Sequence, residues 1–133
     1  MLTPDEGYYF GLGAFETIAV EEGRTILLEK HLNRLQKAAE FLNLFFDKED
    51  VSDRIQSVLS KEEMRTGRKV IKVTLSENNL TVTSRENTYT KEQYKKGFIT
   101  DITTVIRNET SLFTYHKTLN YGDNIQQKRL ARQ

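Results

Sequence analysis

The sequence contains no cysteine, so neither a disulfide nor a thiolate metal site can form within its 133 residues. Its only two histidines, His31 and His116, are too few for a histidine-based metal cluster, and we expect no metal. Neither sign of charge dominates, because 20 basic and 19 acidic residues leave a formal charge of +1. This balance gives no reason to expect nucleic acid or a membrane surface as partner. The chain also lacks an apolar run of membrane-spanning length and a secretion signal, so we expect a cytoplasmic protein.

The residues that are present have the composition of one soluble globular domain, with 37% hydrophobic and 29% charged side chains. Alternating side chains predict strands at several places. The clearest pair is joined by Glu77, Asn78 and Asn79, and asparagine tolerates the backbone angles of a tight hairpin turn. We predict strands at residues 14–20, 25–28, 69–76, 80–84 and 97–106.

Three stretches have the apolar spacing of helices. Residues 28–43 carry one apolar stripe that includes Leu32 and Leu35, and residues 47–50 offer a cap and first-turn acids for a second helix. A third, basic helix is predicted from near Leu119 to the end of the sequence. Together these elements predict an α+β domain of two layers, in which a mostly antiparallel sheet has helices on one side.

Three segments carry candidate chemistry: YYFGLGAFETI (8–18), LLEKHLNRL (27–35) and HKTLNYGDN (116–124). Each has an ordinary structural explanation by itself, as a core strand, a solvated helix face and a surface lysine. A lysine becomes a covalent catalyst when it is desolvated beside a carbonyl cofactor.

In their order and spacing the three segments resemble the class IV aminotransferases, the pyridoxal-phosphate enzymes of fold type IV. That family has a GxGxFET strand, a helix with HxxRL, and a K-x-x-N-Y segment. The resemblance implies that residues 1–133 are the N-terminal domain of such an enzyme, ending just after the lysine segment, with the C-terminal domain absent. The matching residues are Gly11, Gly13, Phe15, Glu16, Thr17, His31, Arg34, Leu35, Lys117, Asn120 and Tyr121.

The resemblance also implies how pyridoxal 5'-phosphate is held. Lys117 matches the Schiff-base lysine, which also moves protons once the substrate has displaced it. Arg34 matches the arginine that binds the cofactor phosphate, for which a planar fork of donors is well suited. Tyr121 matches a tyrosine close to the cofactor, and its spacing of four from Lys117 predicts that both lie on one side of a helical turn.

The substrate side follows from the same match. Phe15 and Thr17 occupy alternate positions of one strand, so they face the same way and would line the substrate pocket. Glu16 then faces the other way, which indicates a structural role. Lys72 stands where relatives often carry arginine, and it would meet a substrate carboxylate with charge but without a bidentate fork. Leu12 and Gly122 also depart from the family pattern, which often has aspartate and leucine there.

The resemblance leaves the reaction open. The sequence segments are most similar to those of the aminodeoxychorismate lyases. These enzymes convert 4-amino-4-deoxychorismate to p-aminobenzoate and pyruvate in folate biosynthesis. Branched-chain or D-amino-acid transamination is the first alternative. A cofactor-free, catalytically incomplete domain is the second. In the enzymatic cases the substrate is a small molecule, and the family implies a homodimer.

Overall fold

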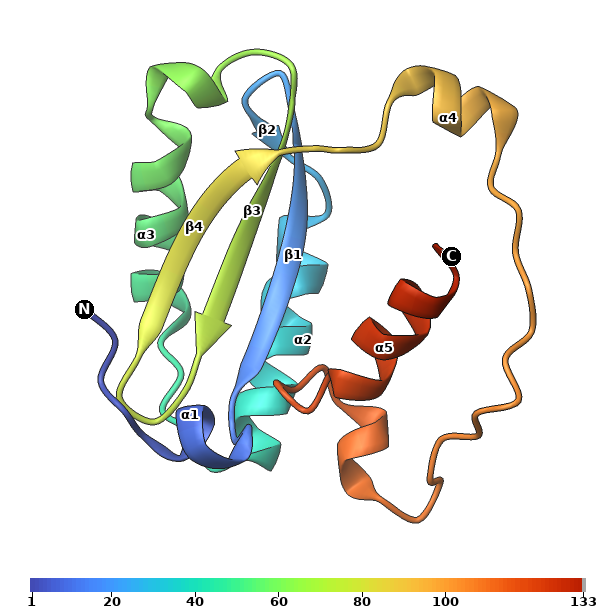
Figure 1. Cartoon of the computed structure of the whole chain (residues 1–133). Coiled ribbons are helices and arrows are strands. Elements are labelled where there is room, and N and C mark those ends of the chain that lie inside the picture. The colour runs from blue at the N-terminus through green and yellow to red at the C-terminus, as the bar shows by residue number, and fades with distance from the viewer. Residues whose placement is uncertain (133) are drawn as a thin grey trace.

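The computed structural model of the chain describes residues 1–132, and its centre is a four-stranded antiparallel sheet in the order β2-β1-β3-β4 (Figure 1). The central pair, β1 and β3, is in register along its whole length, from Ala14 opposite Leu75 to Glu21 opposite Arg68. The predicted hairpin is present as β3 and β4, and the predicted returning strand is reduced to two residues. The strands are β1 (Ala14–Glu21), β2 (Arg24–Thr25), β3 (Arg68–Leu75) and β4 (Leu80–Glu86).

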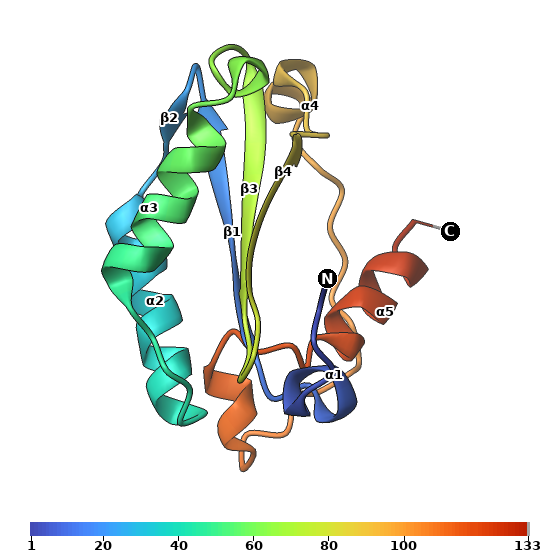
Figure 2. The ribbon, with the colours of Figure 1, turned by 90° about the vertical axis from the view of Figure 1, so that its left-hand side faces the viewer.

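Two helices, α2 (Leu28–Phe41) and α3 (Lys48–Leu59), cover one face of the sheet. Figure 2 views the sheet nearly edge-on, with both helices along one side of it. The core lies between these two layers, where Ile18, Leu35, Ile55 and Ile71 are almost completely buried. Each such side chain contributes roughly 1.5–3 kcal/mol relative to exposure. The predicted two-layer α+β architecture is therefore confirmed.

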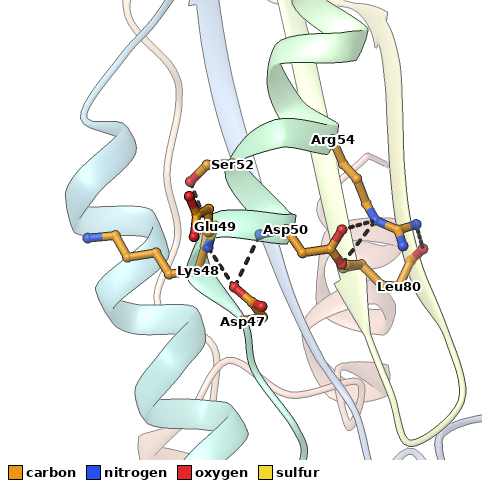
Figure 3. A network of polar contacts seen from close by, with 7 residues as sticks. All are labelled: Asp47, Lys48, Glu49, Asp50, Ser52, Arg54 and Leu80. Atoms are coloured by element: carbon orange, nitrogen blue, oxygen red, sulfur yellow. Dashed lines mark hydrogen bonds and ion pairs between the residues drawn. The ribbon is translucent and has the colours of Figure 1, made fainter.

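A network of polar contacts holds the start of α3 (Figure 3). The side chain of Asp47 accepts hydrogen bonds from the backbone N–H groups of Glu49 and Asp50, which caps the helix as its sequence predicts. One turn later, Arg54 donates to the Asp50 carboxylate at 3.0 and 3.2 Å and to the carbonyl of Leu80 at 3.4 Å. The last contact ties α3 to the first residue of β4.

The predicted strand at residues 97–106 is wrong. This segment has no regular secondary structure, and Ile99, Ile102 and Ile106 are almost fully exposed. The physical reason lies just upstream, where an unpredicted helix, α4 (Lys91–Lys96), begins with a capping box between Thr90 and Gln93. This helix leads the chain away from β4 (Figure 1), so the alternating residues have no neighbouring strand with which to pair.

The final helix begins later and ends earlier than predicted. It is α5 (Gly122–Leu130), and Gln133 lies outside the described residues. Thr118 and Leu119 cannot join it, because they are bonded to the edge of β1. The sequence analysis also missed α1 (Glu6–Phe10) and the 3-10 helices η1 (Glu62–Met64) and η2 (Leu112–Tyr115). No helix among residues 1–132 is long and apolar enough to cross a membrane.

Asp5 joins the N-terminus to the β3–β4 turn. Its buried carboxylate accepts hydrogen bonds from the Ser76 hydroxyl at 2.6 Å, the Asn78 N–H at 2.9 Å, the Asn79 amide at 2.8 Å and the Tyr8 N–H at 3.0 Å. The hydrogen bond from Ser76 is the largest cause that lowers the pKa of Asp5 from 3.8 to about 2, and burial opposes it. Asp5 therefore acts as an ionised acceptor for four donors.

Replacing Asp5 by asparagine is expected to lower the free energy of unfolding by about 1–3 kcal/mol, because one amide oxygen cannot accept from four donors. Urea denaturation measures the change. Asp47→Asn is the matched control, since the exposed Asp47 receives both its bonds on one oxygen and asparagine caps helices as well as aspartate does. Equal loss in the two variants would contradict the assigned role of Asp5.

The lowered pKa of Asp5 also predicts a pH dependence. Because the folded value of about 2 lies below the ordinary 3.8, the unfolded chain takes up the proton first as the pH falls. The stability contributed by ionised Asp5 is complete above about pH 4 and is lost as the pH approaches 2. The difference in unfolding free energy between the wild type and Asp5→Asn should therefore shrink over this interval. A difference that stays constant across the whole interval would contradict the assignment.

Candidate active site

The segment that carries Lys117 is docked on a free edge of β1. Strand β2 pairs only with Val20 and Glu21, which leaves the start of β1 without a partner on that side. There the N–H of Phe15 donates to the carbonyl of Lys117 at 3.2 Å, and the N–H of Leu119 donates to the carbonyl of Gly13 at 2.8 Å. These backbone bonds hold Lys117 beside the GxGxFET strand, which lies far from it in the sequence.

A stack of rings anchors the approach to this segment. His116 lies parallel to the ring of Phe41 at 4.2 Å, and Phe113 meets the same ring edge-on at 5.3 Å. Phe41 is the last residue of α2, so the residue immediately before Lys117 is fixed against that helix. Lys117 is therefore held from both directions along the chain.

The amine of Lys117 packs against aromatic rings. Its Nζ lies 4.2 Å from the centroid of the Phe15 ring and 4.8 Å from that of Tyr121, and the two rings meet edge-on at 5.1 Å. The Nζ of Lys72 lies 5.0 Å from the centroid of the Phe15 ring as well. The faces of aromatic rings attract cations, so the Phe15 ring contacts both lysine amines.

The prediction that Lys117 and Tyr121 share a helical turn is wrong. Residues 117–120 are not helical, and Tyr121 immediately precedes α5. The two side chains nevertheless meet, because both contact the ring of Phe15. Their proximity comes from the docked segment and not from helical periodicity.

Glu16 faces the opposite side of β1 and is only 1% exposed. Its Oε1 accepts from Arg34 Nε at 2.5 Å, and its Oε2 accepts from Arg34 Nη2 at 2.6 Å. The Nδ1 of His31 lies 2.7 Å from the same Oε2. The Glu16 carboxylate thus links β1 to two residues of α2, on the face of the strand opposite to Phe15.

Arg34 carries a stable positive charge. Its hydrogen bond with Glu16 raises the pKa of the guanidinium, burial opposes this, and the charge of Glu16 adds to the increase. The side chain of Arg34 is 55% exposed, and its Nη1 has no hydrogen-bond partner among residues 1–132.

The structure brings the predicted site residues around the start of β1. Thr17 and Lys72 are paired across β1 and β3, so they lie on the same sheet face as Phe15, and both are exposed. Lys117 and Tyr121 pack against Phe15 on this face, whereas Arg34 lies in the layer of helices and bonds to Glu16.

The sequence analysis gave Glu16 a structural role but missed its two partners. The available signal was an acidic residue at a core-facing strand position, followed by a helix with histidine and arginine three residues apart. It also missed why Gly13 is glycine. A Cβ there would lie 2.5 Å from Leu119 Cδ1 and 2.7 Å from the Leu75 carbonyl oxygen. Glycine therefore permits the close approach of the Lys117 segment.

The donor set fits pyridoxal phosphate. A primary amine can bond to the aldehyde carbon, a guanidinium edge can pair with a phosphate, and a phenol can meet the ring or phosphate oxygens. Within residues 1–132 there is no cluster of three or more acidic or histidine side chains that could hold a metal ion.

A lysine amine among aromatic rings and an arginine with an Nη1 unbonded within residues 1–132 are the groups that a carbonyl- and anion-binding site uses. The family described as amino-transferase class IV matches residues 13–133 of the sequence. The chain belongs to this family.

Curated relatives match part of the chain. An aminodeoxychorismate lyase of Bacillus subtilis is 28% identical over 79 residues, which cover 57% of this chain and 27% of the relative. A D-alanine aminotransferase of Listeria monocytogenes is 26% identical over 77 residues, which cover 56% and 27%. The two identities are nearly equal, so they do not distinguish between the two activities.

Solved structures share the fold over almost the whole chain. A protein described as a candidate 4-amino-4-deoxychorismate lyase gives a TM-score of 0.83 at 24% identity, over 99% of this chain and 54% of that one. A hypothetical aminotransferase from Mycobacterium tuberculosis, in a PLP-bound form, gives 0.77 at 20% identity, over 96% and 51%. The chain thus spans about half the length of these two proteins.

The close docking of the Lys117 segment predicts the effect of a methyl group at Gly13. Gly13→Ala is expected to lower the free energy of unfolding by about 1–3 kcal/mol, because its Cβ meets a backbone oxygen that cannot move aside cheaply. The N–H groups of Phe15 and Leu119 should then exchange faster with solvent. Urea denaturation and amide hydrogen exchange measure both effects.

Gly122→Ala is the matched control, because nothing lies within 4 Å of a Cβ there. Alanine at this first residue of α5 should be neutral or stabilising by up to about 1 kcal/mol. Unchanged exchange at Phe15 and Leu119 in Gly13→Ala would show that the segment does not depend on this close approach.

Proposed function

We propose that this protein is a pyridoxal-phosphate-dependent enzyme in which residues 1–133 form the N-terminal domain and Lys117 is the lysine that binds the cofactor. The observation that carries the proposal is the position of the Lys117 amine between Phe15 and Tyr121, on the sheet face that also bears Thr17 and Lys72. The PLP-bound form of the M. tuberculosis relative supports the choice of cofactor.

Three side chains would hold the cofactor. Lys117 binds its aldehyde carbon, and the free Nη1 of Arg34 donates to its phosphate. The Tyr121 hydroxyl would donate to an oxygen of the cofactor ring or of its phosphate. The rings of Phe15 and Tyr121 pack against the amine and hold it in place beside the sheet. When bound, pyridoxal phosphate withdraws electrons from the substrate carbon that carries the amino group.

The substrate we propose is 4-amino-4-deoxychorismate. Lys117 removes the proton from the ring carbon that bears the amine. The carbon–oxygen bond at the neighbouring ring carbon then breaks, and the electrons of the broken C–H bond complete the aromatic ring. The enolpyruvyl group leaves and takes up a proton as pyruvate, so the products are p-aminobenzoate and pyruvate. The exposed Lys72, opposite Thr17, would pair with a substrate carboxylate. The match to the B. subtilis lyase supports this choice.

Transamination of a D-amino acid is the second candidate, favoured by the match to the D-alanine aminotransferase. Lys117 would then move a proton between the substrate carbon and the cofactor carbon, without breaking a carbon–oxygen bond. Branched-chain amino acids are a further substrate class for the same chemistry. The family also supports a homodimer as the active form, and Tyr8, Tyr9 and Phe10 on α1 offer exposed aromatic surface for association.

The lyase proposal predicts equal amounts of p-aminobenzoate and pyruvate from 4-amino-4-deoxychorismate. The protein as its gene encodes it should form both, and Lys117→Ala should reduce the rate by at least roughly 10²–10⁴-fold, the usual contribution of a general base. Borohydride reduction followed by peptide mass spectrometry should find the cofactor on Lys117.

Lys128→Ala is the control, because Lys128 is a lysine on the last turn of α5, away from the Phe15 ring, and should leave both measurements unchanged. If the protein transfers the amino group of D-alanine to a 2-oxo acid and forms no p-aminobenzoate, the lyase proposal is wrong and the transaminase proposal is supported. A protein that takes up no cofactor would support the cofactor-free, catalytically incomplete domain.

A further inference from the structure

Glu16 is a carboxylate placed among apolar side chains. It lies on the helix-facing side of β1, between the buried Ala14 and Ile18, and opposite the buried Val73 of β3. A carboxylate at 1% exposure loses most of its hydration, which costs free energy unless hydrogen bonds replace the water. A hydrophobic residue of similar size would usually stabilise such a position as well or better. Stability alone therefore gives a weak reason for glutamate here.

The hydrogen bonds of Glu16 hold the Arg34 guanidinium in one plane. Nε and Nη2 donate to the two carboxylate oxygens at 2.5 and 2.6 Å, the bidentate arrangement that fixes both the position and the tilt of the group. The terminal nitrogen left is Nη1, which has no partner within residues 1–132. The edge of Arg34 that can bind an anion is thus set by its bonds to Glu16.

His31 holds the carboxylate in turn. It precedes Arg34 by three residues on α2, so both side chains lie on one face of that helix. Because a carboxylate only accepts hydrogen bonds, the His31 Nδ1 at 2.7 Å must carry the proton. Glu16 therefore receives donors on both oxygens and has little freedom to rotate away from Arg34.

We infer that Glu16 is a positioning residue, which orients Arg34 so that Nη1 points to the phosphate of pyridoxal phosphate. This inference rests on the proposed function. Glu16 does not itself reach the cofactor, because neighbouring residues of a strand face opposite ways and Phe15 contacts Lys117. Strand β1 therefore presents Phe15 to the pocket on one face, and on the other face it presents Glu16, which holds Arg34.

Glu16→Gln tests the inference, since it keeps the shape but offers one acceptor to three donors. The dissociation constant for pyridoxal phosphate, measured by equilibrium dialysis, should rise roughly 10–100-fold, the range seen when the partner of a ligand-binding side chain is removed. The ³¹P NMR resonance of the bound phosphate should shift. In the protein without cofactor, the Nε–H of Arg34 should exchange faster with water.

A merely structural role for Glu16 would lower stability without these effects. Ile55→Val is the control for stability, because Ile55 is buried on α3 and the change removes one methylene from the core. It should leave cofactor affinity and the phosphate resonance unchanged. The second comparison uses Arg34→Lys, whose ammonium lacks the fork that Glu16 holds. In that background, Glu16→Gln should have almost no further effect on affinity.

Two outcomes would overturn the positioning role alone. The first is that Glu16→Gln binds pyridoxal phosphate with the affinity of the wild type. The second is that Glu16→Gln weakens this binding by the same factor whether residue 34 is arginine or lysine. A wild-type protein that binds no pyridoxal phosphate would overturn the proposed function, and the positioning role with it. Loss of affinity that disappears in the Arg34→Lys background would establish the role of Glu16.

Discussion

The alternation of side chains along β1 is the constraint on which the rest of the structure depends. Successive residues of a strand point to opposite faces, so Glu16 and Ile18 enter the layer of helices while Phe15 and Thr17 stay on the other face. A shift of one residue in the pairing with β3 would reverse every side chain. The full-length register between β1 and β3 excludes that shift, and it thereby fixes both the core and the candidate site.

The free edge of β1 is the second requirement. Had β2 continued beside it, the backbone groups of Gly13 and Phe15 would be paired within the sheet, and the Lys117 segment would have no place to bind. Instead the short β2 leaves this edge open, and a segment from the far end of the chain occupies it. Gly13 permits the approach because it has no side chain to meet Leu119. The free edge of β1, which could otherwise pair with a strand of another molecule, is thus occupied by the segment that positions Lys117.

Sequence reasoning succeeded where a local pattern also decides the tertiary environment. The helices around Leu35 and Ile55 and the hairpin between β3 and β4 have regularly spaced apolar residues. Burying all of these side chains against one sheet permits few other arrangements of the helices and strands. It failed at residues 97–106, where the same kind of alternation has no neighbouring strand. It also failed between Lys117 and Tyr121, where a spacing of four suggested a helix but backbone bonds to β1 hold the segment in a non-helical conformation.

The sequence by itself determined the layers, the family and the identity of the chemical groups: a lysine, an arginine and a tyrosine in a recognisable order. Only the tertiary structure decided how these groups meet. The contact of Lys117 with Phe15 and the hold of Glu16 on Arg34 join residues from separate elements, and such pairs follow from packing and register rather than from spacing along the chain. The physical reason is that burial strengthens the hydrogen bonds of a carboxylate in the core, and that the faces of aromatic rings attract a lysine amine.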